Sequence, residues 1–322
     1  MNVRSPGAVG FIGLGNMGAP MAARLVGAEY EVRGFDLSVP ARKVFAEAAL
    51  AAAEARAGAA ATETGAGATT EVGAGAASLA DAVRGAAVVV LMLPDSNAVA
   101  ATLHDEGFDV APGTIVVDMS SSEPLRTRAL AAELASRNVT LIDAPVSGGV
   151  ARAKTGKLTI MAGGEPSDLD RVAPILAELG TVTRAGDVGS GHAVKALNNL
   201  LSATHLLVTS EAILAGERFG LDPETMVSIF NGSSGRSGST ENKWPNFILP
   251  GTFDSGFGLR LMLKDMRIAT GLADEVGAPD PLGHAAVELW TRAAEQLEDT
   301  ADHTEIVNWL RSAESTAGEG SS

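Results

Sequence analysis

The chain has 322 residues, 46% of them hydrophobic, and its 39 acidic and 24 basic side chains give a formal net charge of −15. This length and composition predict one large or two ordinary domains, with enough apolar residues for a core. The acidic balance argues against a nucleic-acid-binding or anionic-membrane surface, and the absence of cysteine excludes disulfides, thiol nucleophiles and Cys-ligated zinc.

A glycine-rich turn follows a short apolar run near the start of the chain. Residues 8–12 predict a strand, Gly13, Gly15 and Gly18 form G-x-G-x-x-G, and residues 19–25 predict a helix. The first glycine permits the tight turn, the second lets the backbone approach a pyrophosphate, and the third lets the helix pack on the strand. A tight turn without a ligand would explain the glycines alone. The whole arrangement instead predicts a dinucleotide site at Gly13, Leu14, Gly15, Asn16, Met17 and Gly18.

A second apolar run, 30–35, ends at Asp36, 18 residues after the last of these glycines. A dinucleotide fold places the acidic residue that binds the adenosine ribose at about this point. The four residues after Asp36 include no cation, and Arg33 is expected to point away from it because strand side chains alternate. We therefore predict NAD rather than NADP as the cofactor, unless the downstream cations Arg42 or Lys43 reach the ribose.

Further short apolar runs alternate with helical patterns such as 124–136. These strand candidates are 88–93, 114–117 and 140–142, with 158–162 and 181–183 as candidates to extend the same sheet. Alternating strands and helices predict an α/β fold, a Rossmann-type doubly wound parallel sheet. Residues 46–77 are different, because they are almost all Ala, Gly, Thr and Glu. We expect helix to about Arg56 and then a mobile surface excursion, since few large apolar side chains are available to bury.

Beyond Gly189 helical periodicity dominates. Helices are expected at 192–219, 223–230, 261–275, 281–296 and 304–313. We therefore predict a dinucleotide-binding domain at 1–188, an all-α substrate and dimerisation domain at 189–314, joined to the first by a long helix, and a disordered tail at 315–322.

One polar stretch, 231–245, interrupts these helical patterns. It is either an exposed loop or a segment that brings Asn231, Arg236 or Lys243 to a substrate pocket, and the sequence leaves both interpretations open.

The five histidines are scattered, and none belongs to an H-E-x-x-H pattern, so we expect no protein metal site. Residues 1–8 lack the apolar segment of a signal peptide, and the longest apolar run, 86–93, is far too short to span a bilayer. We expect a cytoplasmic protein whose partners include neither nucleic acid nor a membrane.

Polar segments follow three of the predicted strands. They are Leu93-Pro94-Asp95, Asp118-Met119-Ser120-Ser121-Ser122 and Asp143-Ala144-Pro145-Val146-Ser147-Gly148-Gly149. The carboxyl ends of strands form the ligand crevice in a doubly wound sheet, and a serine before two glycines can cradle a carboxylate. Any one of them also fits an ordinary strand-exit turn. Three on one edge favour a site for a small anionic substrate.

A lysine lies near the start of the long apolar helix predicted from 192. Lys195 and Asn199 are four residues apart and share a face, with His192 and Ser202 on nearly the same stripe. Such a lysine is either a surface residue with a buried stem or a desolvated acid/base, because burial lowers a lysine pKa towards neutrality. A nearby dinucleotide favours the second interpretation.

Together these motifs resemble the β-hydroxyacid dehydrogenase family, which includes 3-hydroxyisobutyrate dehydrogenase and tartronate semialdehyde reductase and is related to 6-phosphogluconate dehydrogenase. The resemblance covers about 9–310. It rests on the glycine fingerprint, Asp118-Met119-Ser120-Ser121, the segment 143–149, Gly189-x-Gly191-x-x-x-Lys195-x-x-Asn198-Asn199 and Lys264-Asp265.

The resemblance implies a role for each matching residue. Lys195 matches the catalytic lysine, Asn199 the asparagine that helps to hold substrate and lysine, and Ser147, Gly148 and Gly149 the substrate-carboxylate loop. Cofactor contacts are implied for Leu93, Pro94 and Lys264. Ser121, where the family usually has threonine, is implied to lie near the nicotinamide and the substrate, and Asp265 and Phe257 to border the closed site. His192 is not the commonest residue at its position, and the resemblance assigns it no effect.

The resemblance implies an NAD-dependent enzyme that transfers a hydride between nicotinamide and a short 3-hydroxy acid or its semialdehyde. It implies a homodimer or homotetramer. Two alternatives stay open: a dinucleotide-binding scaffold without turnover, against which Lys195 argues, and an imine reductase on the same fold, which usually has another residue in place of that lysine.

Overall fold

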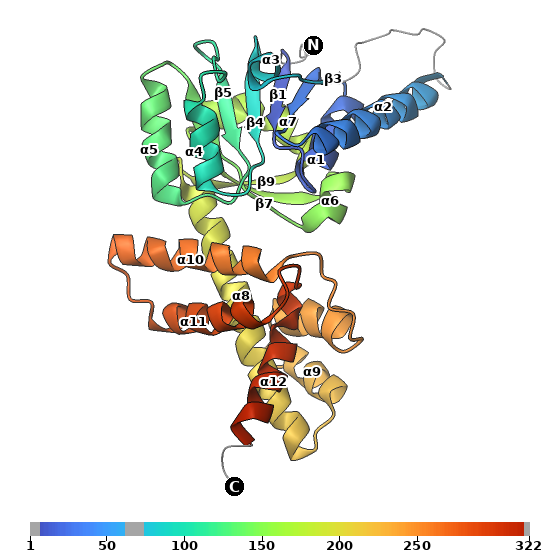
Figure 1. Ribbon diagram of the computed structural model, residues 1–322, viewed down its shortest axis with the longest axis vertical. Helices are drawn as coiled ribbons and strands as arrows, with labels where there is room; N and C mark the ends of the chain where they lie inside the picture. Colours follow the sequence, from blue (N-terminus) through green and yellow to red (C-terminus); the bar gives the residue numbers. More distant parts are fainter. Residues whose placement is uncertain (1–6, 62–73, 319–322) are drawn as a thin grey trace. The chain divides into compact units, whose positions relative to one another are not determined.

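The computed structural model describes residues 7–61 and 74–318 (Figure 1). The chain divides into two compact units, Met1–Lys195 and Ala196–Ser322, and each is described by itself. None of the helices within the described residues combines the length and the apolar character needed to cross a bilayer.

Among its described residues, unit 1 contains a mixed sheet of nine strands. The strands are β1 (Val9–Ile12), β2 (Val32–Phe35), β3 (Ala74–Gly75), β4 (Val88–Leu91), β5 (Ile115–Asp118), β6 (Thr140–Asp143), β7 (Val146–Ser147), β8 (Leu158–Gly163) and β9 (Gly180–Gly186). Their order is β3-β2-β1-β4-β5-β6-β8-β7, with β9 paired to β8. The first six are parallel and follow the Rossmann order, which confirms the predicted fold class.

Helices pack on both faces of this sheet. They are α1 (Gly18–Gly27), α2 (Val39–Ala61), α3 (Leu79–Val83), α4 (Ser96–His104), α5 (Pro124–Ala135), α6 (Gly149–Thr155) and α7 (Pro166–Leu179). α1 packs against α2, α6 and α7, while α4 packs against α5 (Figure 1). Alternate strand residues enter two cores: Val117 joins the one beneath α1, and Val116 joins the one that includes residues of α4 and α5. The central strands are therefore apolar throughout, as parallel strands covered on both faces require.

The end of the sheet departs from the expected all-parallel pattern. β8 is antiparallel to β6 and to β7, although it pairs with β9 in parallel. Only the seven-residue helix α6 lies between β7 and β8, and this is shorter than the crossover that a parallel pair needs.

The Ala/Gly-rich segment is more regular than expected. α2 continues to Ala61, past Arg56, and β3 pairs in parallel with β2. The prediction of an irregular excursion up to 77 is therefore wrong at β3, because backbone hydrogen bonds to β2 make a strand out of an Ala-Gly pair. The rest of the predicted mobile segment, 62–73, lies outside the described residues.

Unit 2 is helical. α8 (Ser190–Phe219) begins within unit 1 and is followed by α9 (Pro223–Asn231), the π-helix η1 (Ser239–Ile248), α10 (Leu259–Val276), α11 (Pro281–Gln296), the 3₁₀-helix η2 (His303–Glu305) and α12 (Ile306–Gly318). Its core includes Trp244, Trp290 and Met266, all fully buried. Residues 315–318 of the predicted disordered tail instead form the end of α12, and 319–322 lie outside the described residues.

The polar stretch 231–245 is an exposed loop only in part. From Ser239 it forms η1, where Trp244 and Ile248 are buried and the Ser237 hydroxyl accepts hydrogen bonds from the Ser239 and Thr240 N–H groups. The polar composition hid this element because one tryptophan supplies much of its buried surface.

Candidate active site

The turn between β1 and α1 has the shape that a pyrophosphate requires. Gly13 has φ 94°, and a Cβ there would lie 2.2 Å from the Met92 carbonyl oxygen. A Cβ on Gly18 would lie 1.9 Å from the Gly13 oxygen, whereas a Cβ on Gly15 would meet nothing within 4 Å. Packing therefore requires glycine at positions 13 and 18, whereas Gly15 leaves open space beside the start of α1. This arrangement fits a dinucleotide.

Asp36 lies at the carboxyl end of β2 and is joined to this turn. Its Oδ2 accepts the Leu14 N–H at 2.8 Å, and its Oδ1 accepts the Ser38 N–H at 2.7 Å. Each carboxylate oxygen has two lone pairs, so the two backbone donors leave acceptor capacity for ribose hydroxyls. Arg42 donates to the Asp36 carbonyl oxygen, and its guanidinium lies 5.6 Å from the centre of the Phe35 ring.

The ends of β4 and β5 are linked by a serine that the sequence did not single out. The Ser120 hydroxyl accepts the Leu93 N–H at 2.9 Å, next to the predicted cofactor contacts Leu93 and Pro94. Asp95 caps α4 by accepting the N–H groups of Asn97 and Ala98, so its role is structural. Ser121, the predicted nicotinamide neighbour, is half-buried in the same turn.

The predicted carboxylate loop follows β7. Gly148 and Gly149 have φ values of 129° and 67°, a region that favours glycine, and α6 begins at Gly149. A Cβ on Gly149 would meet nothing within 4 Å. Ser147 is half-buried and ends the two-residue strand that pairs with β8. The loop therefore combines a hydroxyl with open backbone at Gly149, whereas a Cβ on Gly148 would lie 2.5 Å from Arg152 Cδ.

The start of α8 is fixed to the ends of β5 and β6 by buried charges. Asp143 accepts the Gly189 N–H at 2.6 Å and the His192 N–H at 2.8 Å. Burial raises the pKa of Asp143, and the nearby His192 only partly offsets this. Lys195, one turn along α8, is 6% exposed. The predicted general acid/base is thus a buried lysine on a helix anchored at the carboxyl edge of the sheet.

Asp118, Asp143 and His192 were present in the sequence motifs without assigned roles. The hydrogen bonds that join Asp143 and His192 to other elements connect residues at least 46 positions apart, and only Asp118 bonds to residues in its own turn. No local spacing in the sequence therefore reveals the network. The one available signal was an aspartate at the end of each of two adjacent strands.

In unit 2 the predicted residues Asn199, Lys264 and Asp265 meet. Asn199 Nδ2 donates to Asp265 Oδ2 at 2.6 Å, and Lys264 Nζ lies 3.4 Å from Asp265 Oδ1. Asn199 and Asp265 are buried. The carboxylate therefore orients the amide, whose oxygen accepts from Asn198 Nδ2 at 3.2 Å. Phe257 lies in a separate network, with its ring 5.8 Å from that of His303.

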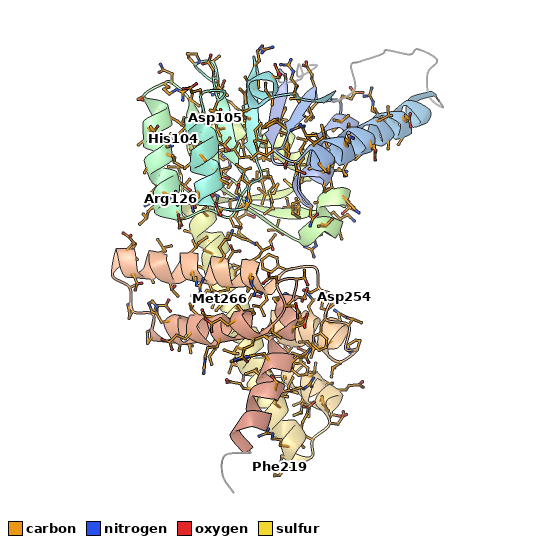
Figure 2. All side chains as sticks on the ribbon, viewed as in Figure 1. His104, Asp105, Arg126, Phe219, Asp254 and Met266 are labelled. Carbon is orange, nitrogen blue, oxygen red and sulfur yellow. The ribbon has the colours of Figure 1, made fainter. Side chains whose placement is uncertain are left out.

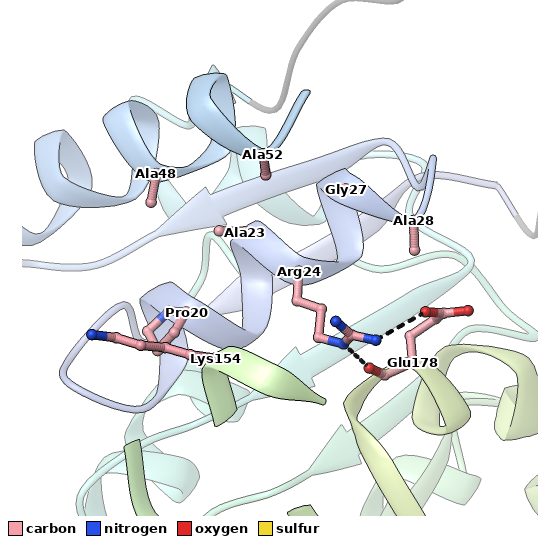
Figure 3. Close-up of a pocket in the computed structure, with 9 residues that line it drawn as sticks. All are labelled: Pro20, Ala23, Arg24, Gly27, Ala28, Ala48, Ala52, Lys154 and Glu178. Atoms are coloured by element: carbon pink, nitrogen blue, oxygen red, sulfur yellow. Dashed lines mark hydrogen bonds and ion pairs between the residues drawn. The ribbon is translucent and has the colours of Figure 1, made fainter. Parts of the chain in front are cut away.

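A surface pocket of about 460 Å³ on unit 1 lies away from these residues (Figure 3). It is lined by Pro20, Ala23, Arg24, Gly27, Ala28, Ala48, Ala52, Lys154 and Glu178. Arg24 donates to the Glu178 carbonyl oxygen and lies 3.7 Å from its carboxylate. None of the predicted site residues lines this pocket, so it is not the active site.

Comparisons with known proteins match both parts of the chain. Residues 8–189 match the NAD-binding domain of 6-phosphogluconate dehydrogenase, and residues 189–310 match the NAD-binding family of NADP-dependent 3-hydroxyisobutyrate dehydrogenase. The NAD-dependent L-serine dehydrogenase of Pseudomonas aeruginosa is 36% identical over 88% of this chain and 90% of its own. The 2-(hydroxymethyl)glutarate dehydrogenase of Eubacterium barkeri is 35% identical over 88% and 87%.

A solved structure agrees with these relatives. The 3-hydroxyisobutyrate dehydrogenase of Mycobacterium tuberculosis, solved with L-serine, is 30% identical, covers 95% of this chain and 99% of its own, and superposes with a TM-score of 0.82. This chain therefore belongs to the β-hydroxyacid dehydrogenase family and is an NAD(P)-dependent dehydrogenase of β-hydroxy acids.

Proposed function

We propose that this enzyme prefers NAD and oxidises short 3-hydroxy acids to their semialdehydes, or runs the reverse reduction, with Lys195 as general base and acid. The observation that carries the proposal is the burial of Lys195 on a helix whose first turn is fixed by Asp143 at the carboxyl edge of the sheet. The glycine turn opens at that same edge, because β1 and β6 run in parallel within one sheet.

A nicotinamide bound at this edge would accept the hydride from the carbinol carbon in oxidation and return it in reduction, and the residues of the chain handle the proton and the position of the substrate. In oxidation Lys195 Nζ takes the hydroxyl proton as the C–H bond breaks, and in reduction it returns the proton to the carbonyl oxygen. Ser147, Gly148 and Gly149 hold the substrate carboxylate through a hydroxyl and backbone N–H groups. Fixing this remote anion orients the carbinol carbon, which is a large part of the rate.

The helical unit contributes Asn199, whose amide is oriented by Asp265. We assign Asn199 to hold the substrate and the lysine, with Phe257 and Asp265 at the substrate side and Lys264 at the cofactor. For the glycine domain we assign Gly13 to Gly18 and Asp36 to the dinucleotide, and Leu93, Pro94 and Ser121 to its nicotinamide end.

The substrates for which the relatives are named support the substrate class. L-serine, 3-hydroxyisobutyrate and 2-(hydroxymethyl)glutarate are all 3-hydroxy acids with a primary alcohol, and they differ in the group on C2. A carboxylate cradle and a lysine at a fixed separation select this shared part. We therefore expect a 2-substituted 3-hydroxypropionate as substrate, with the C2 substituent as the variable.

A panel of such acids and their semialdehydes, each assayed with NAD and with NADP, tests the proposal. We expect turnover of at least one 2-substituted 3-hydroxypropionate, and no turnover of the matching 2-hydroxy acid, whose carbinol carbon is one bond closer to the carboxylate. Turnover of 2-hydroxy acids alone would reject the substrate class. Imine reduction without alcohol oxidation would favour the alternative reaction on this fold.

Lys195→Ala tests the chemistry. We expect kcat to fall by roughly 10²–10⁴, the usual contribution of a general acid/base, with the dissociation constant for NADH almost unchanged. Lys157→Ala, a substitution elsewhere in unit 1, is the matched control. Activity of the Lys195 variant within threefold of the unmodified enzyme would remove this residue from the mechanism.

We also propose a cytoplasmic homodimer or homotetramer. In the helical unit α8 exposes Leu197, Leu201 and Val208, which recur at helical spacing on one face. An apolar stripe of this kind is typical of an interaction surface. Light scattering of the purified protein tests the oligomeric state, and a monomer at micromolar concentration would contradict the proposal.

A further inference from the structure

Three ionisable side chains are buried together where β5 and β6 meet the start of α8. Asp118, Asp143 and His192 are each at most 1% exposed. His192 Nε2 lies 3.7 Å from Asp118 Oδ2, and its Nδ1 lies 3.9 Å from Asp143 Oδ2. Burial of carboxylates is costly unless hydrogen bonds or opposite charges compensate. The hydrogen bonds and the nearby ring do not fully offset this cost at Asp143, because its pKa remains raised.

Asp143 lies in a space made by two glycines. A Cβ on Gly163 would lie 2.5 Å from Asp143 Oδ1, and a Cβ on Gly191 would lie 2.9 Å from its Oδ2 and 2.1 Å from the Met161 carbonyl oxygen. Gly191 thus lets α8 approach β8 closely enough for the carboxylate to accept the N–H groups at positions 189 and 192. A carboxylate here also opposes the positive end of the helix dipole. Asp143 fixes where α8 begins.

His192 connects this anchor to two further elements. Its Nδ1 lies 2.8 Å from the hydroxyl of Thr127 in α5, and that hydroxyl donates to the Glu123 carbonyl oxygen. The hydroxyl therefore accepts from Nδ1–H, which sets the proton on this nitrogen. Nε2 has no hydrogen-bond partner among the described residues and faces Asp118, whose carboxylate accepts the Ser120 N–H and the Ser122 hydroxyl.

We propose that His192 and Asp143 are positioning residues that hold the first turn of α8 and thereby place Lys195 for proton transfer. The inference rests on the proposed role of Lys195 as acid/base. Lys195 follows His192 by three residues, so a shift of the first turn moves its amine. A misplacement of about 1 Å can cost about 10²-fold in rate.

The positioning role predicts a change in the pH dependence of kcat. Burial raises the pKa of Asp143 and the His192 ring lowers it, so the pKa rises further when the ring is removed. A protonated Asp143 is a weaker cap, and activity is then lost at a higher pH on the acid side. The groups that face the His192 ring are Asp118 from β5, Asp143 from β6 and the neutral Thr127 hydroxyl from α5, and the nearest charged residue along its own helix is Lys195.

Two substitutions at His192 test the proposal on the full-length enzyme, with the best substrate of the panel. For His192→Leu we expect kcat to fall at least about tenfold, with NADH affinity within about twofold and the acid limb of the kcat profile shifted to higher pH. His192→Gln keeps a donor for Thr127 and should recover kcat to within about threefold of the unmodified enzyme. His104→Leu is the control, because His104 is an exposed histidine paired with Glu133 (Figure 2). It should change none of these quantities.

The outcomes separate a positioning role from a merely structural one. A His192→Leu enzyme that melts earlier but keeps kcat and its pH profile well below the melting temperature overturns the proposal. If that variant does not fold, Thr127→Val removes only the hydroxyl that accepts from His192. A roughly threefold lower kcat in Thr127→Val then supports the proposal, and an unchanged kcat overturns it.

The same experiments distinguish this inference from the proposed function. An inactive Lys195→Ala enzyme together with an unaffected His192→Leu enzyme rejects only the positioning role. An active Lys195→Ala enzyme rejects the function on which the inference rests.

Discussion

Each compact unit buries an aspartate beside a histidine, Asp143 with His192 in unit 1 and Asp302 with His303 in unit 2. Asp302 accepts the N–H groups of Gly256 at 2.9 Å and Thr304 at 2.9 Å, and hydroxyl hydrogen bonds from Ser255 and Thr304. Burial acts to raise the pKa of Asp302, but hydrogen bonds from His303 and Thr304 outweigh it and hold the pKa well below its usual range. The pKa of Asp143, in contrast, is raised.

His303 has several close partners in unit 2. His303 Nδ1 lies 3.0 Å from the Phe257 carbonyl oxygen and 3.3 Å from Asp302 Oδ1, and its N–H donates to both acceptors, so Nε2 accepts from Lys243. Burial lowers the pKa of His303, and Lys243 adds to this against the opposing effect of Asp302. A neutral histidine therefore completes a network around Ser255, Phe257 and Asp302 that is well supplied with donors. This network holds the segment before α10 against the start of η2 and stabilises the helical unit.

The opposite pKa shifts of Asp302 and Asp143 distinguish a buried carboxylate that stabilises the fold from one that costs stability. A carboxylate with many donors contributes to folding stability, whereas one whose pKa is raised is ionised at the expense of stability. Such a cost is expected where a charge serves function.

Asp302→Asn should lower the stability of the helical unit by about 2 kcal/mol at neutral pH, or roughly thirtyfold in the unfolding equilibrium, because hydrogen bonds to a charged group are lost. The folded pKa is depressed below the ordinary value of 3.8, so this stability is present above that pH and is lost as the pH falls through the folded pKa. The difference between the variant and the unmodified protein should therefore shrink in acid. Urea unfolding followed by tryptophan fluorescence measures it, since Trp244, Trp290 and Trp309 all lie in unit 2.

Asp143→Asn is the matched substitution, and its pH dependence should have the opposite sign. The folded pKa of Asp143 is raised, so its contribution is fully present below 3.8 and is lost as the pH rises through the folded pKa. Hydrogen exchange at 188–195 reports on this region. If the stability difference from the unmodified protein changed with pH in the same direction for both variants, the proposed difference between Asp302 and Asp143 would be wrong.

Asp36 adds a third carboxylate, at the exposed end of β2, with two backbone donors. We expect kcat/KM to favour NAD by at least about tenfold, or ~1.4 kcal/mol, because a 2′-phosphate would meet a like charge. Asp36→Ser combined with Leu37→Arg should erode or reverse the preference. Steady-state kinetics with both cofactors decide the matter. Equal use of NADP that is lost in Arg42→Ala would show that Arg42, rather than Asp36, governs the choice.

The sequence predicted the elements whose periodicity is long and regular. The alternating apolar strands and the glycine turn predicted β1, β2, β4, β5 and β6 of the Rossmann sheet, and α11 has the predicted bounds. β3 was missed because Ala74-Gly75 has no strand propensity and depends on β2 for its hydrogen bonds. The π-helix η1 was missed because its sequence is mostly polar. Its stability depends on the burial of its own Trp244 against core residues from other helices of unit 2.

For the site residues too, local patterns were predictable from the sequence and contacts between distant residues were not. Chain order and local motifs were enough to select Lys195, Asn199 and the two glycine-rich loops as candidates, and those roles remain predictions. The hydrogen bonds from Asn199 to Asp265 and from α8 to Asp143 join positions 46 to 66 residues apart. Contacts of this kind are set by packing of whole elements, so no spacing in the sequence could reveal them.

The smallest effect is expected at Arg236, in the polar stretch before η1. Its Nε lies 3.6 Å from Glu241 Oε1, and both side chains are more than half exposed. Exposed ion pairs contribute little, so Arg236→Ala should change stability by less than about 0.5 kcal/mol and leave kcat and KM within about twofold. Lys243→Met is the contrasting substitution on the same segment, because Lys243 contacts the buried His303 and its loss should lower stability measurably. Kinetics and tryptophan-detected unfolding of both variants test the pair. A KM for the best substrate that rises severalfold in Arg236→Ala would instead assign Arg236 to the substrate, and would show that exposure alone does not separate structural charges from functional ones in this unit.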